Sequence, residues 1–295
     1  PKRITRRRAL GLAAGGAIAA PLALRAAAPR IEGAPAPSDR IGLGFIGIGR
    51  MGQGHLGLLL RDPQVRVRGV CDVDPIRRRN AQAAVEGAYG AGADCAAHND
   101  LRELLARGDI DAVLIATGDR WHVPAGVLAM KAGKDVYCEK PVSLTIRESR
   151  VLREVAARYG RVFQTGLQQR TTLEFRLACD LVRRGRLGKI SHVYVCFPGT
   201  VREVNLPGEP VPEGLDWDLW LGPAPWRPFN HRYHEYGEPK NVVPWHFCPD
   251  FGGGNLTSNA VHAFDVVQWG LGMDASGPVE VTPGGVAGQV AASEV

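Results

Sequence analysis

The chain lacks the cysteine spacing of a metal site or of a disulfide framework. It has no C-x-x-C pair and no cysteine–histidine cluster at the spacing of metal ligands, so we expect neither a bound metal nor disulfides. Several cysteines fall inside apolar runs, where a thiol packs as a small hydrophobic side chain. The six residues are Cys71, Cys95, Cys138, Cys179, Cys196 and Cys248.

Most of the chain also lacks an excess of positive charge. The formal net charge is +6, but residues 1–38 hold seven of the 36 basic residues and one of the 30 acidic ones. The remainder carries 29 of each sign and is formally neutral. A phosphate backbone is bound through clustered positive charge, so we expect no nucleic-acid partner.

The N-terminal apolar run is too short for a membrane span. Residues 5–29 join a basic start, an apolar stretch rich in Ala and Gly, and Ala26-Ala27-Ala28, as in an export signal. The uncharged run Ala9–Leu24 has 16 residues, against the roughly 20 of a membrane span. The paired arginines resemble a twin-arginine signal. We therefore expect an exported, periplasmic protein without an integral span; a disordered basic tail or an uncleaved anchor is the alternative.

From residue 40 to about 166, short apolar runs alternate with longer helical patterns. This alternation is typical of parallel strands covered by helices on both faces. It predicts an α/β fold with a doubly wound, six-stranded parallel sheet of the Rossmann type. Five strands are placed at Ile41–Ile46, Val65–Cys71, Asp111–Ala116, Asp135–Cys138 and Arg161–Thr165. The helix candidates are Met51–Leu60, Pro75–Glu86, Leu101–Ala106, Val123–Ala132 and Leu144–Tyr159.

A glycine-rich turn follows the first predicted strand. It reads Gly47-Ile48-Gly49-Arg50-Met51-Gly52. In this G-x-G-x-x-G spacing, Gly47 permits a tight turn, Gly49 lets backbone N–H groups approach a pyrophosphate, and Gly52 lets the helix pack on the strand. Asp72, 20 residues beyond Gly52, is placed to accept hydrogen bonds from the adenosine ribose. The turn and its context predict a dinucleotide site.

The charges after the second predicted strand bear on the choice of cofactor. Asp72 and Asp74 would repel a 2′-phosphate, which favours NAD over NADP. Arg77, Arg78 and Arg79 argue the other way, although a charge run at the start of a helix is commonly solvated. We expect NAD, with NADP as the alternative.

A lysine follows the run Asp135–Cys138 in the sequence Glu139-Lys140-Pro141. This position is at the carboxyl edge of the sheet, where a nicotinamide would lie. A partly desolvated lysine can exchange the proton of a substrate hydroxyl while hydride leaves the adjacent carbon. A surface lysine paired with Glu139 is the alternative.

These motifs resemble the glucose-fructose oxidoreductase, inositol dehydrogenase and MocA-like (Gfo/Idh/MocA) family. The resemblance spans about residues 40–275 and includes the glycine turn, Ala116–His122 and Glu139–Pro141. It continues in the family's order through Gln164–Arg170, Leu187–Ile190, Leu215–Gly222, Gly252–Leu256 and His262–Asp265. It implies an oxidoreductase that transfers hydride between a secondary hydroxyl of a sugar, polyol or glycoside and a nicotinamide cofactor.

The resemblance also implies roles for single residues. Lys140 and His262 would be catalytic, although a packed core histidine is the alternative for His262. Glu139, Thr117 and His122 would help to hold the cofactor. Substrate contacts are expected from Gln168, Arg170, Arg232, Tyr233, Ser258 and His262. The tryptophans that would stack on sugar faces, or pack in a core, are Trp217, Trp220, Trp226 and Trp245.

The second half is expected to form a different domain. The pattern changes to a helix (Leu173–Arg184) and a strand (Ile190–Phe197), and the resemblance implies an open, mainly antiparallel sheet over the nicotinamide. We therefore expect an export signal and linker at 1–38, an NAD(P)-binding Rossmann domain at 39–166 and a substrate-binding α+β domain at 167–295. The family's second domain continues through further strands, so we expect this domain to be incomplete and the full-length protein to be a homo-oligomer.

One position departs from the family's pattern. Many relatives carry an aspartate four residues before the catalytic histidine, but this chain has Ser258 followed by Asn259. Serine cannot hold the charge that would orient a neighbouring group. Either Lys140 and His262 suffice, or the substrate differs, or the chemistry is impaired. NAD binding without turnover is therefore one rival hypothesis, and the resemblance implies a second, NAD-dependent glycoside cleavage through transient oxidation.

Overall fold

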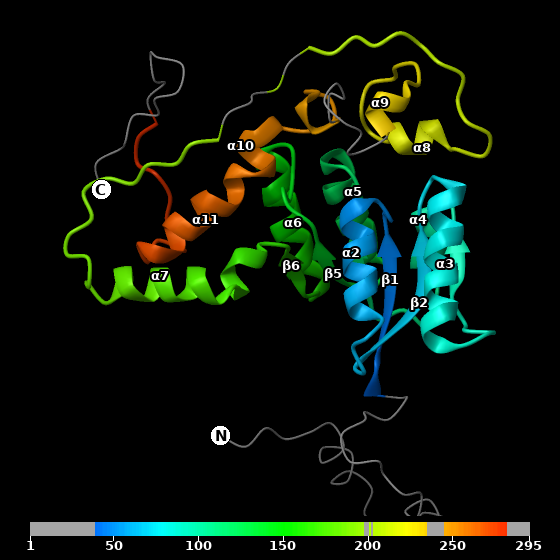
Figure 1. Cartoon of the computed structure of the whole chain (residues 1–295), viewed down its shortest axis with the longest axis horizontal. Helices are drawn as coiled ribbons and strands as arrows, with labels where there is room; N and C mark the ends of the chain where they lie inside the picture. The colour runs from blue at the N-terminus through cyan, green and yellow to red at the C-terminus, as the bar shows by residue number, and fades with distance from the viewer. Residues whose placement is uncertain (1–38, 198–200, 202, 235–244, 282–295) are drawn as a thin grey trace, which may run out of the picture. The chain divides into compact units, whose positions relative to one another are not determined.

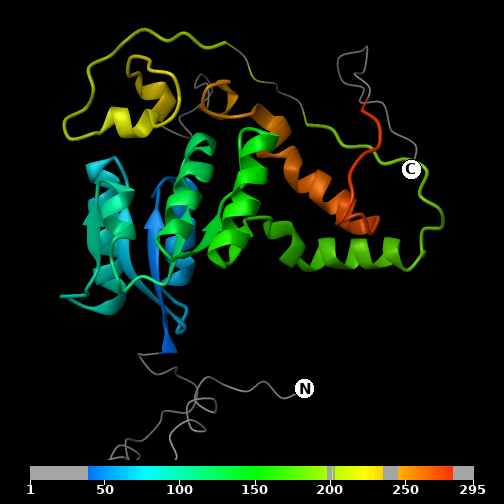
Figure 2. The ribbon, with the colours of Figure 1, turned by 180° about the vertical axis from the view of Figure 1, so that it is seen from behind.

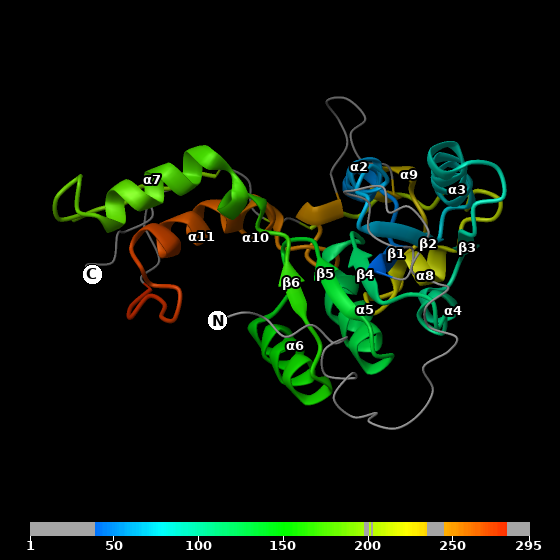
Figure 3. The same ribbon diagram turned by 90° about the horizontal axis from the view of Figure 1, so that it is seen from below.

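The computed structural model describes residues 39–197, 201, 203–234 and 245–281. Six parallel strands form one sheet in the order β3-β2-β1-β4-β5-β6 (Figures 1 and 3). The order reverses between β1 and β4, which makes the sheet doubly wound. The predicted fold class is confirmed, while the expected export signal, residues 1–38, lies outside the described residues. The strands are β1 (Ile41–Ile46), β2 (Val65–Cys71), β3 (Ala96–His98), β4 (Ala112–Ile115), β5 (Asp135–Cys138) and β6 (Phe163–Thr165).

Helices cover both faces of this sheet. On one face lie α2 (Arg50–Leu59) and α3 (Pro75–Tyr89), and on the other lie α4 (Leu101–Leu105), α5 (Asp119–Lys131) and α6 (Ile146–Tyr159) (Figure 3). Seen from behind, the two green helices α5 and α6 lie in front of the sheet (Figure 2). The central strands β1 and β4 are therefore buried on both faces, which explains why their sequences are nearly continuous apolar runs.

Each face of the sheet has its own hydrophobic core. On the α2 and α3 side, Phe45 and Val67 pack with Val85. On the other side, Val113 and Ile115 pack with helix residues that include Met130. Fully burying one such side chain contributes about 1.5–3 kcal/mol, so these two cores fix the sheet that carries the site.

Capping residues set where two of the helices begin. In α6, the Thr145 side chain accepts a hydrogen bond from the Glu148 N–H, and the Glu148 side chain accepts one from the Thr145 N–H. In α3, Asp74 caps the helix and Pro75 follows it at the first helical position, where its missing N–H costs nothing. A cap of this kind stabilises a helix by about 1 kcal/mol.

The predicted strands agree with the observed ones to within two residues at each end. The sixth strand, which the sequence pattern did not place, is β3, whose three residues are too few to show a period. The fourth helix begins earlier than expected, at Asp119 rather than Val123. An acidic residue in the first turn of a helix is favoured by the helix dipole. Because the helix begins at Asp119, Pro124 lies in its interior and not at its second position.

Within the described residues, the regular structure after β6 consists of helices, and α11 packs along α7 (Figures 1 and 3). A third core gathers around Trp217, Trp220 and Phe251. The helices are α7 (Leu173–Arg183), α8 (Trp217–Leu221), α9 (His231–His234), α10 (Gly254–Ser258) and α11 (Ala260–Gly270), with the short turns η3 (Gln168–Thr171) and η4 (Trp245–Phe247).

The prediction of a strand over Ile190–Phe197 is wrong. A strand forms only when a neighbouring strand completes its backbone hydrogen bonds, and no described residue after β6 forms a strand. The segment has no regular structure, with Val193 and Tyr194 exposed. The expected antiparallel sheet therefore has no strand within the described ranges.

All six cysteines are free; Cys196 is exposed and the other five are buried. Across the described ranges, no three or more His, Cys, Asp or Glu side chains are grouped so that they could hold a metal ion. The same residues include no helix with the length and hydropathy of a membrane span.

Candidate active site

A cavity of about 390 Å³ lies at the carboxyl edge of the sheet. One wall is formed by the glycine turn after β1, the end of β2, the start of α5 and Lys140 after β5. The other wall comes from the region after β6, with Trp220, His246 and Ser258. The cavity therefore includes the switch point between β1 and β4, where doubly wound sheets bind ligands.

The glycine turn packs so closely that two of its residues must be glycine. Gly47 has φ +88°, and a Cβ there would lie 2.8 Å from the backbone of Ala116. A Cβ on Gly52 would lie 2.1 Å from the Gly47 carbonyl oxygen. The turn therefore sits directly against both β4 and its own helix.

The third glycine leaves room for a ligand. A Cβ on Gly49 would meet only the Arg77 side chain, at 3.8 Å, and Gly49 lines the cavity. Helix α2 begins there with no side-chain cap and no acidic residue in its first turn. Its N–H groups and the positive end of its dipole are thus left for an anion such as a pyrophosphate. Arg50 and Met51 also line this end of the cavity, while Ile48 is buried.

Asp72 both closes the turn and faces the cavity. Its Oδ2 accepts the Ile48 N–H at 2.6 Å, and its Oδ1 accepts the Asp74 N–H at 2.9 Å. The residue is 7% exposed and lines the cavity. Because each carboxylate oxygen has two lone pairs, both oxygens keep an acceptor site for ribose hydroxyls.

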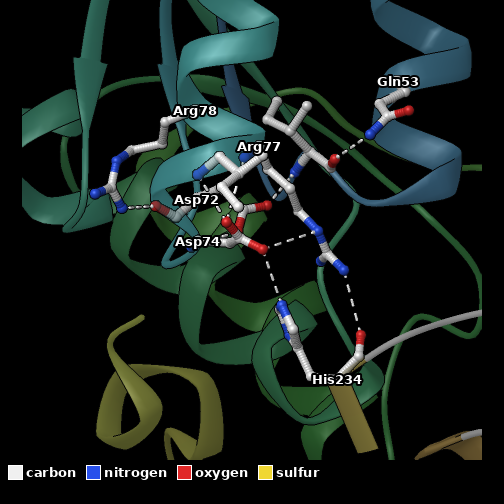
Figure 4. Close-up of polar contacts among 8 residues, drawn as sticks. Gln53, Asp72, Asp74, Arg77, Arg78 and His234 are labelled. Atoms are coloured by element: carbon white, nitrogen blue, oxygen red, sulfur yellow. Dashed lines mark hydrogen bonds and ion pairs between the residues drawn. The ribbon is translucent and has the colours of Figure 1, made fainter. Parts of the chain in front are cut away.

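Two of the three arginines after β2 are held by the protein (Figure 4). Arg78 Nη1 donates to Asn99 Oδ1 at 2.6 Å and also to the Asp72 carbonyl oxygen. Arg77 Nη2 donates to the His234 carbonyl at 3.2 Å. The interpretation of this run as solvated is therefore wrong for Arg77 and Arg78, because partners distant in sequence supply acceptors; Arg79 is exposed.

A histidine from α9 joins the same cluster (Figure 4). His234 Nε2 lies 3.0 Å from Asp74 Oδ2. Burial and the positive charge of Arg77 lower the pKa of His234, so the neutral ring donates to the carboxylate. Burial works to raise the pKa of Asp74, but the bonds from His234 and from two backbone N–H groups hold it below its ordinary value. The adenosine end of the cavity is therefore tied to the region after β6.

Lys140 lies at the opposite end of the cavity. Its Nζ donates to the Ser258 carbonyl oxygen at 2.8 Å, and both residues line the cavity. Ser258 ends α10, so a helix carbonyl, rather than the serine side chain, fixes the ammonium. The alternative of a surface lysine paired with Glu139 is not what the structure has.

Glu139 instead bonds to other neighbours. It is 3% exposed, and its Oε1 lies 2.6 Å from both His55 Nε2 and Gln168 Nε2. Burial would raise the pKa of Glu139, but the hydrogen bond and charge of His55 lower it below its usual value. Gln168, a predicted substrate contact, thus serves to hold this carboxylate.

His122 lies behind the cavity wall. The ring is 1% exposed, with Nδ1 2.6 Å from the Pro141 carbonyl and Nε2 3.1 Å from the Thr117 carbonyl. It connects the loops that follow β4 and β5. Thr117 lines the cavity as expected, whereas His122 positions the backbone around it.

Two further histidines lie near Lys140. His246 lines the cavity, and burial together with the charge of Lys140 lowers its pKa to about 4. The same two causes lower the pKa of His262. His262, on α11, is outside the cavity lining, and its buried Nδ1 has no hydrogen-bond partner among the described residues. Both rings are therefore neutral near pH 7.

Like Gln168 and His262, three other predicted substrate residues lie away from the cavity lining. Arg170 donates to both Asp265 oxygens and to Asp274, each at 2.7 Å. Tyr233 is 2% exposed and its hydroxyl donates to the Val204 carbonyl. Arg232 is also absent from the lining. Successive helix residues point in directions about 100° apart, which explains why the neighbouring His234 lines the cavity instead.

The tryptophans divide between core and cavity. Trp217 and Trp220 stack at 4.5 Å between ring centroids in the third core. Trp220 also lines the cavity, as does Trp245. Trp226 is 73% exposed and lies elsewhere. Two of the four therefore remain candidates for a sugar platform.

Asp119 lies in the Ala116–His122 loop that the resemblance placed at the cofactor but was not singled out from the sequence, and His234 and His246 of the lining were not predicted. Asp119 carried a usable signal, since it begins a helix at the carboxyl edge of β4 inside a motif already noted. The two histidines lie more than 100 residues after the glycine turn, and no local pattern marks them.

Comparison with known proteins gives two family matches. Residues 41–167 match the NAD-binding Rossmann fold of the Gfo/Idh/MocA oxidoreductase family, and residues 196–291 match that family's C-terminal alpha/beta domain.

Individual relatives are similar over part of their length. The rhizopine catabolism protein MocA of Rhizobium meliloti is 31% identical over 158 residues, which are 54% of this chain and 47% of the relative. A glycosyl hydrolase family 109 protein of Shewanella pealeana is 29% identical over 174 residues, 57% of this chain and 37% of the relative. The chain spans less than half the length of either.

Among solved structures, a probable dehydrogenase from Thermotoga maritima has a TM-score of 0.52 at 22% identity, over 79% of this chain and 55% of that one. This likeness concerns the fold alone.

Proposed function

Since the chain belongs to the Gfo/Idh/MocA oxidoreductase family, we propose that it transfers a hydride between a secondary hydroxyl of a sugar, polyol or glycoside and NAD. The observation that carries this proposal is Lys140, which shares one cavity with the glycine turn. A dinucleotide held at the turn along the edge of the sheet brings its nicotinamide toward that lysine.

The residues present fit NAD. The uncapped start of α2 and the open space at Gly49 suit the pyrophosphate, and Asp72 keeps acceptor sites for the ribose. When bound, the nicotinamide supplies the hydride acceptor. Asp72 and Asp74 put negative charge where a 2′-phosphate would lie, and Arg77 and Arg78 are engaged with protein acceptors. These contacts support NAD over NADP.

Lys140 handles the proton in this proposal. One of its three N–H bonds is directed to the Ser258 carbonyl, which leaves two for a substrate hydroxyl and a second partner. During oxidation the hydroxyl proton passes to Lys140 in its neutral amine form, which thereby becomes the ammonium, and during reduction the ammonium returns the proton. His262, neutral near pH 7, is the group that accepts the proton next, whereas a pKa of about 4 makes His246 too weak a base to take it. Trp220 and Trp245 provide apolar faces for a sugar.

Lys140→Met tests the proposal directly. We expect kcat for NAD reduction with an accepted polyol to fall by about 10³-fold, the size of general acid–base catalysis, while the Kd for NAD stays within about twofold. NADH absorbance and calorimetry measure the two quantities. Lys131→Met, an exposed lysine at the end of α5, is the matched control. Near-full activity in Lys140→Met would remove this mechanism.

A second candidate function is glycoside cleavage through transient oxidation by NAD, which the similarity to the glycosyl hydrolase family 109 protein favours. Release of the aglycone from a nitrophenyl glycoside without accumulation of NADH would support it. Ser258 motivates the third reading, NAD binding without turnover, which predicts tight NAD binding and no reaction across a broad sugar and glycoside panel.

We also propose that the protein is exported, on the basis of the paired arginines before the apolar run Ala9–Leu24. Residues 1–38 fused to a reporter should direct it to the periplasm, and replacing Arg6 and Arg7 by lysine should abolish that transport. Retention of the unchanged fusion in the cytoplasm would contradict the proposal.

A further inference from the structure

Asp119 is a buried acid whose role the proposed function does not explain. It is the first residue of α5, it is 2% exposed, and it lines the same cavity as Lys140. Its Oδ2 has no hydrogen-bond partner among the described residues. An unsatisfied buried carboxylate oxygen costs several kcal/mol, so a fold that keeps one in a cavity points to a partner there.

Each oxygen of the other two carboxylates in the cavity already accepts a hydrogen bond, and for Glu139 Oε2 the donor is the Lys140 backbone N–H. Asp72 takes the N–H groups of the glycine turn and of Asp74. Glu139 accepts hydrogen bonds from His55 and Gln168. Of the three acids in the lining, Asp119 is therefore the one with an oxygen left for a charged partner at this end.

Lys140 is the cation at the same edge of the sheet as this oxygen, with no ion pair within 4.0 Å between the two side chains. Strands β4 and β5 are parallel neighbours, with Ile115 paired to Cys138, so the residues that follow them meet at one edge. The Lys140 ammonium uses the Ser258 carbonyl and keeps other N–H bonds. Its charge favours the ionised form of Asp119 more than any other nearby group does.

Apart from Arg120, whose Nη1 is a second buried donor without a hydrogen-bond partner among the described residues, the remaining charged groups around Asp119 are neutral or of the same sign. Arg120, next to it on α5, donates to the Trp220 and Leu221 carbonyls and stacks on the Trp220 ring at 3.8 Å. His246 from η4 and His262 from α11 are neutral near pH 7, because burial and Lys140 lower the pKa of each. Glu139 carries the same sign as Asp119 and cannot pair with it.

We propose that Asp119 is a positioning residue that pairs with Lys140 and holds its ammonium toward the substrate hydroxyl. This inference rests on the proposed function. In this arrangement Asp119, at the start of α5, supplies the negative charge that Ser258, at the end of α10, cannot hold. Burial raises the pKa of Asp119 to about 7, against the opposing effect of Lys140, so the pair forms as pH rises through neutrality.

The first test follows the carboxyl carbon of Asp119 by carbon-13 NMR in protein labelled at aspartate, without cofactor. Asp119→Asn identifies the signal by removing it. We expect a titration midpoint near pH 7 in the wild type and a midpoint about one pH unit higher in Lys140→Met, because the favourable charge is lost. An unchanged midpoint in Lys140→Met would overturn the pairing.

The second test is the pH profile of polyol oxidation. Below about pH 6, Asp119→Asn and the wild type should have similar kcat, because the acid is then protonated in both. Above about pH 8 the variant should be about tenfold slower, with its profile flat through neutrality. A purely structural loss would lower kcat equally at every pH, and weakened NAD binding alone would leave the profile unchanged; either result would overturn the proposal.

Asp111→Asn is the matched control, because Asp111 precedes β4 at the opposite end and accepts the Gly42 N–H at 2.7 Å. It should leave both the NMR midpoint and the profile unchanged. A protein that shows the NMR coupling but turns over no polyol would contradict the proposed function and leave the pairing intact. Turnover of a polyol by a protein whose NMR midpoint is unchanged in Lys140→Met would contradict the pairing and leave the proposed function intact.

Discussion

The two ends of the cavity are built in different ways. At the cofactor end, the backbone makes the site: Gly47 and Gly52 allow close contacts, and Gly49 opens the start of α2. At the catalytic end, side chains make it: Lys140 is fixed by the carbonyl of Ser258, which is 118 residues further along the chain. The cofactor end is formed by one continuous turn, whereas the catalytic end requires several segments that are distant in sequence to pack together.

This difference determines how each end tolerates change. The backbone site at the glycine turn is lost when a side chain is added to it, since carbonyl oxygens and Cβ atoms cannot share a position. The site at the catalytic end is made of side chains, so it loses activity when one charge or one hydrogen-bond donor is removed, while the fold remains intact. The predictions below place substitutions at the two ends, with controls matched in residue type.

Gly52→Ala should give the largest effect and test the backbone end. Its Cβ would lie 2.1 Å from the Gly47 carbonyl oxygen, so α2 must shift. We expect a loss of about 3 kcal/mol in the free energy of unfolding and an NAD affinity lower by about 100-fold or more, since the anion site moves with the helix. Urea unfolding and calorimetry measure both.

Gly57→Ala is the control on the same helix, because no atom lies within 4 Å of its added Cβ. It should bind NAD normally and gain up to about 1 kcal/mol from better helix propensity. Equal NAD affinity in Gly52→Ala and Gly57→Ala would show that the glycine turn does not hold the cofactor.

The same contrast explains what the sequence could predict. The glycine turn, Asp72 and Lys140 were predictable, because each lies beside a strand with a clear apolar pattern. His234 and His246 were not, because their approach depends on the packing of α9 and η4 against the sheet. Arg170 and Tyr233 show the converse: motif position suggested substrate, but Asp265 and the third core bind them. The strand expected at Ile190–Phe197 failed because pairing is a property of two segments.

The pH dependence of stability tests the catalytic end. Burial raises the pKa of Asp119 from 3.8 to about 7, so its contribution to stability is complete below its unfolded pKa and is lost as pH rises through about 7. Between about pH 5 and pH 8, the wild type should lose roughly 2–3 kcal/mol of unfolding free energy relative to Asp119→Asn. Denaturant titrations of both proteins measure the difference, and parallel pH curves would contradict the raised pKa.

His262→Asn should have a smaller effect, at a residue close to Lys140 but outside the cavity lining. If the neutral ring takes part in proton exchange, kcat should fall by about 10- to 100-fold with the NAD Kd unchanged. His192→Asn, in an exposed segment, is the control. A kcat equal to that of the control would make His262 a packed residue of α11 without a role in proton exchange.

Asp74→Ser should have the smallest effect and returns to the cofactor end, where one side chain adds to what the backbone provides. Serine can still cap α3, but it removes a negative charge and the contact with His234, and it releases Arg77. The ratio of NAD to NADP affinity should fall by about tenfold, or about 1.4 kcal/mol, measured as the two Kd values. Asp100→Ser, at the equivalent cap of α4, should leave the ratio unchanged. If Asp74→Ser also leaves the ratio of NAD to NADP affinity unchanged, Asp72 and the glycine turn determine the choice of cofactor, and Asp74 makes no contribution to it.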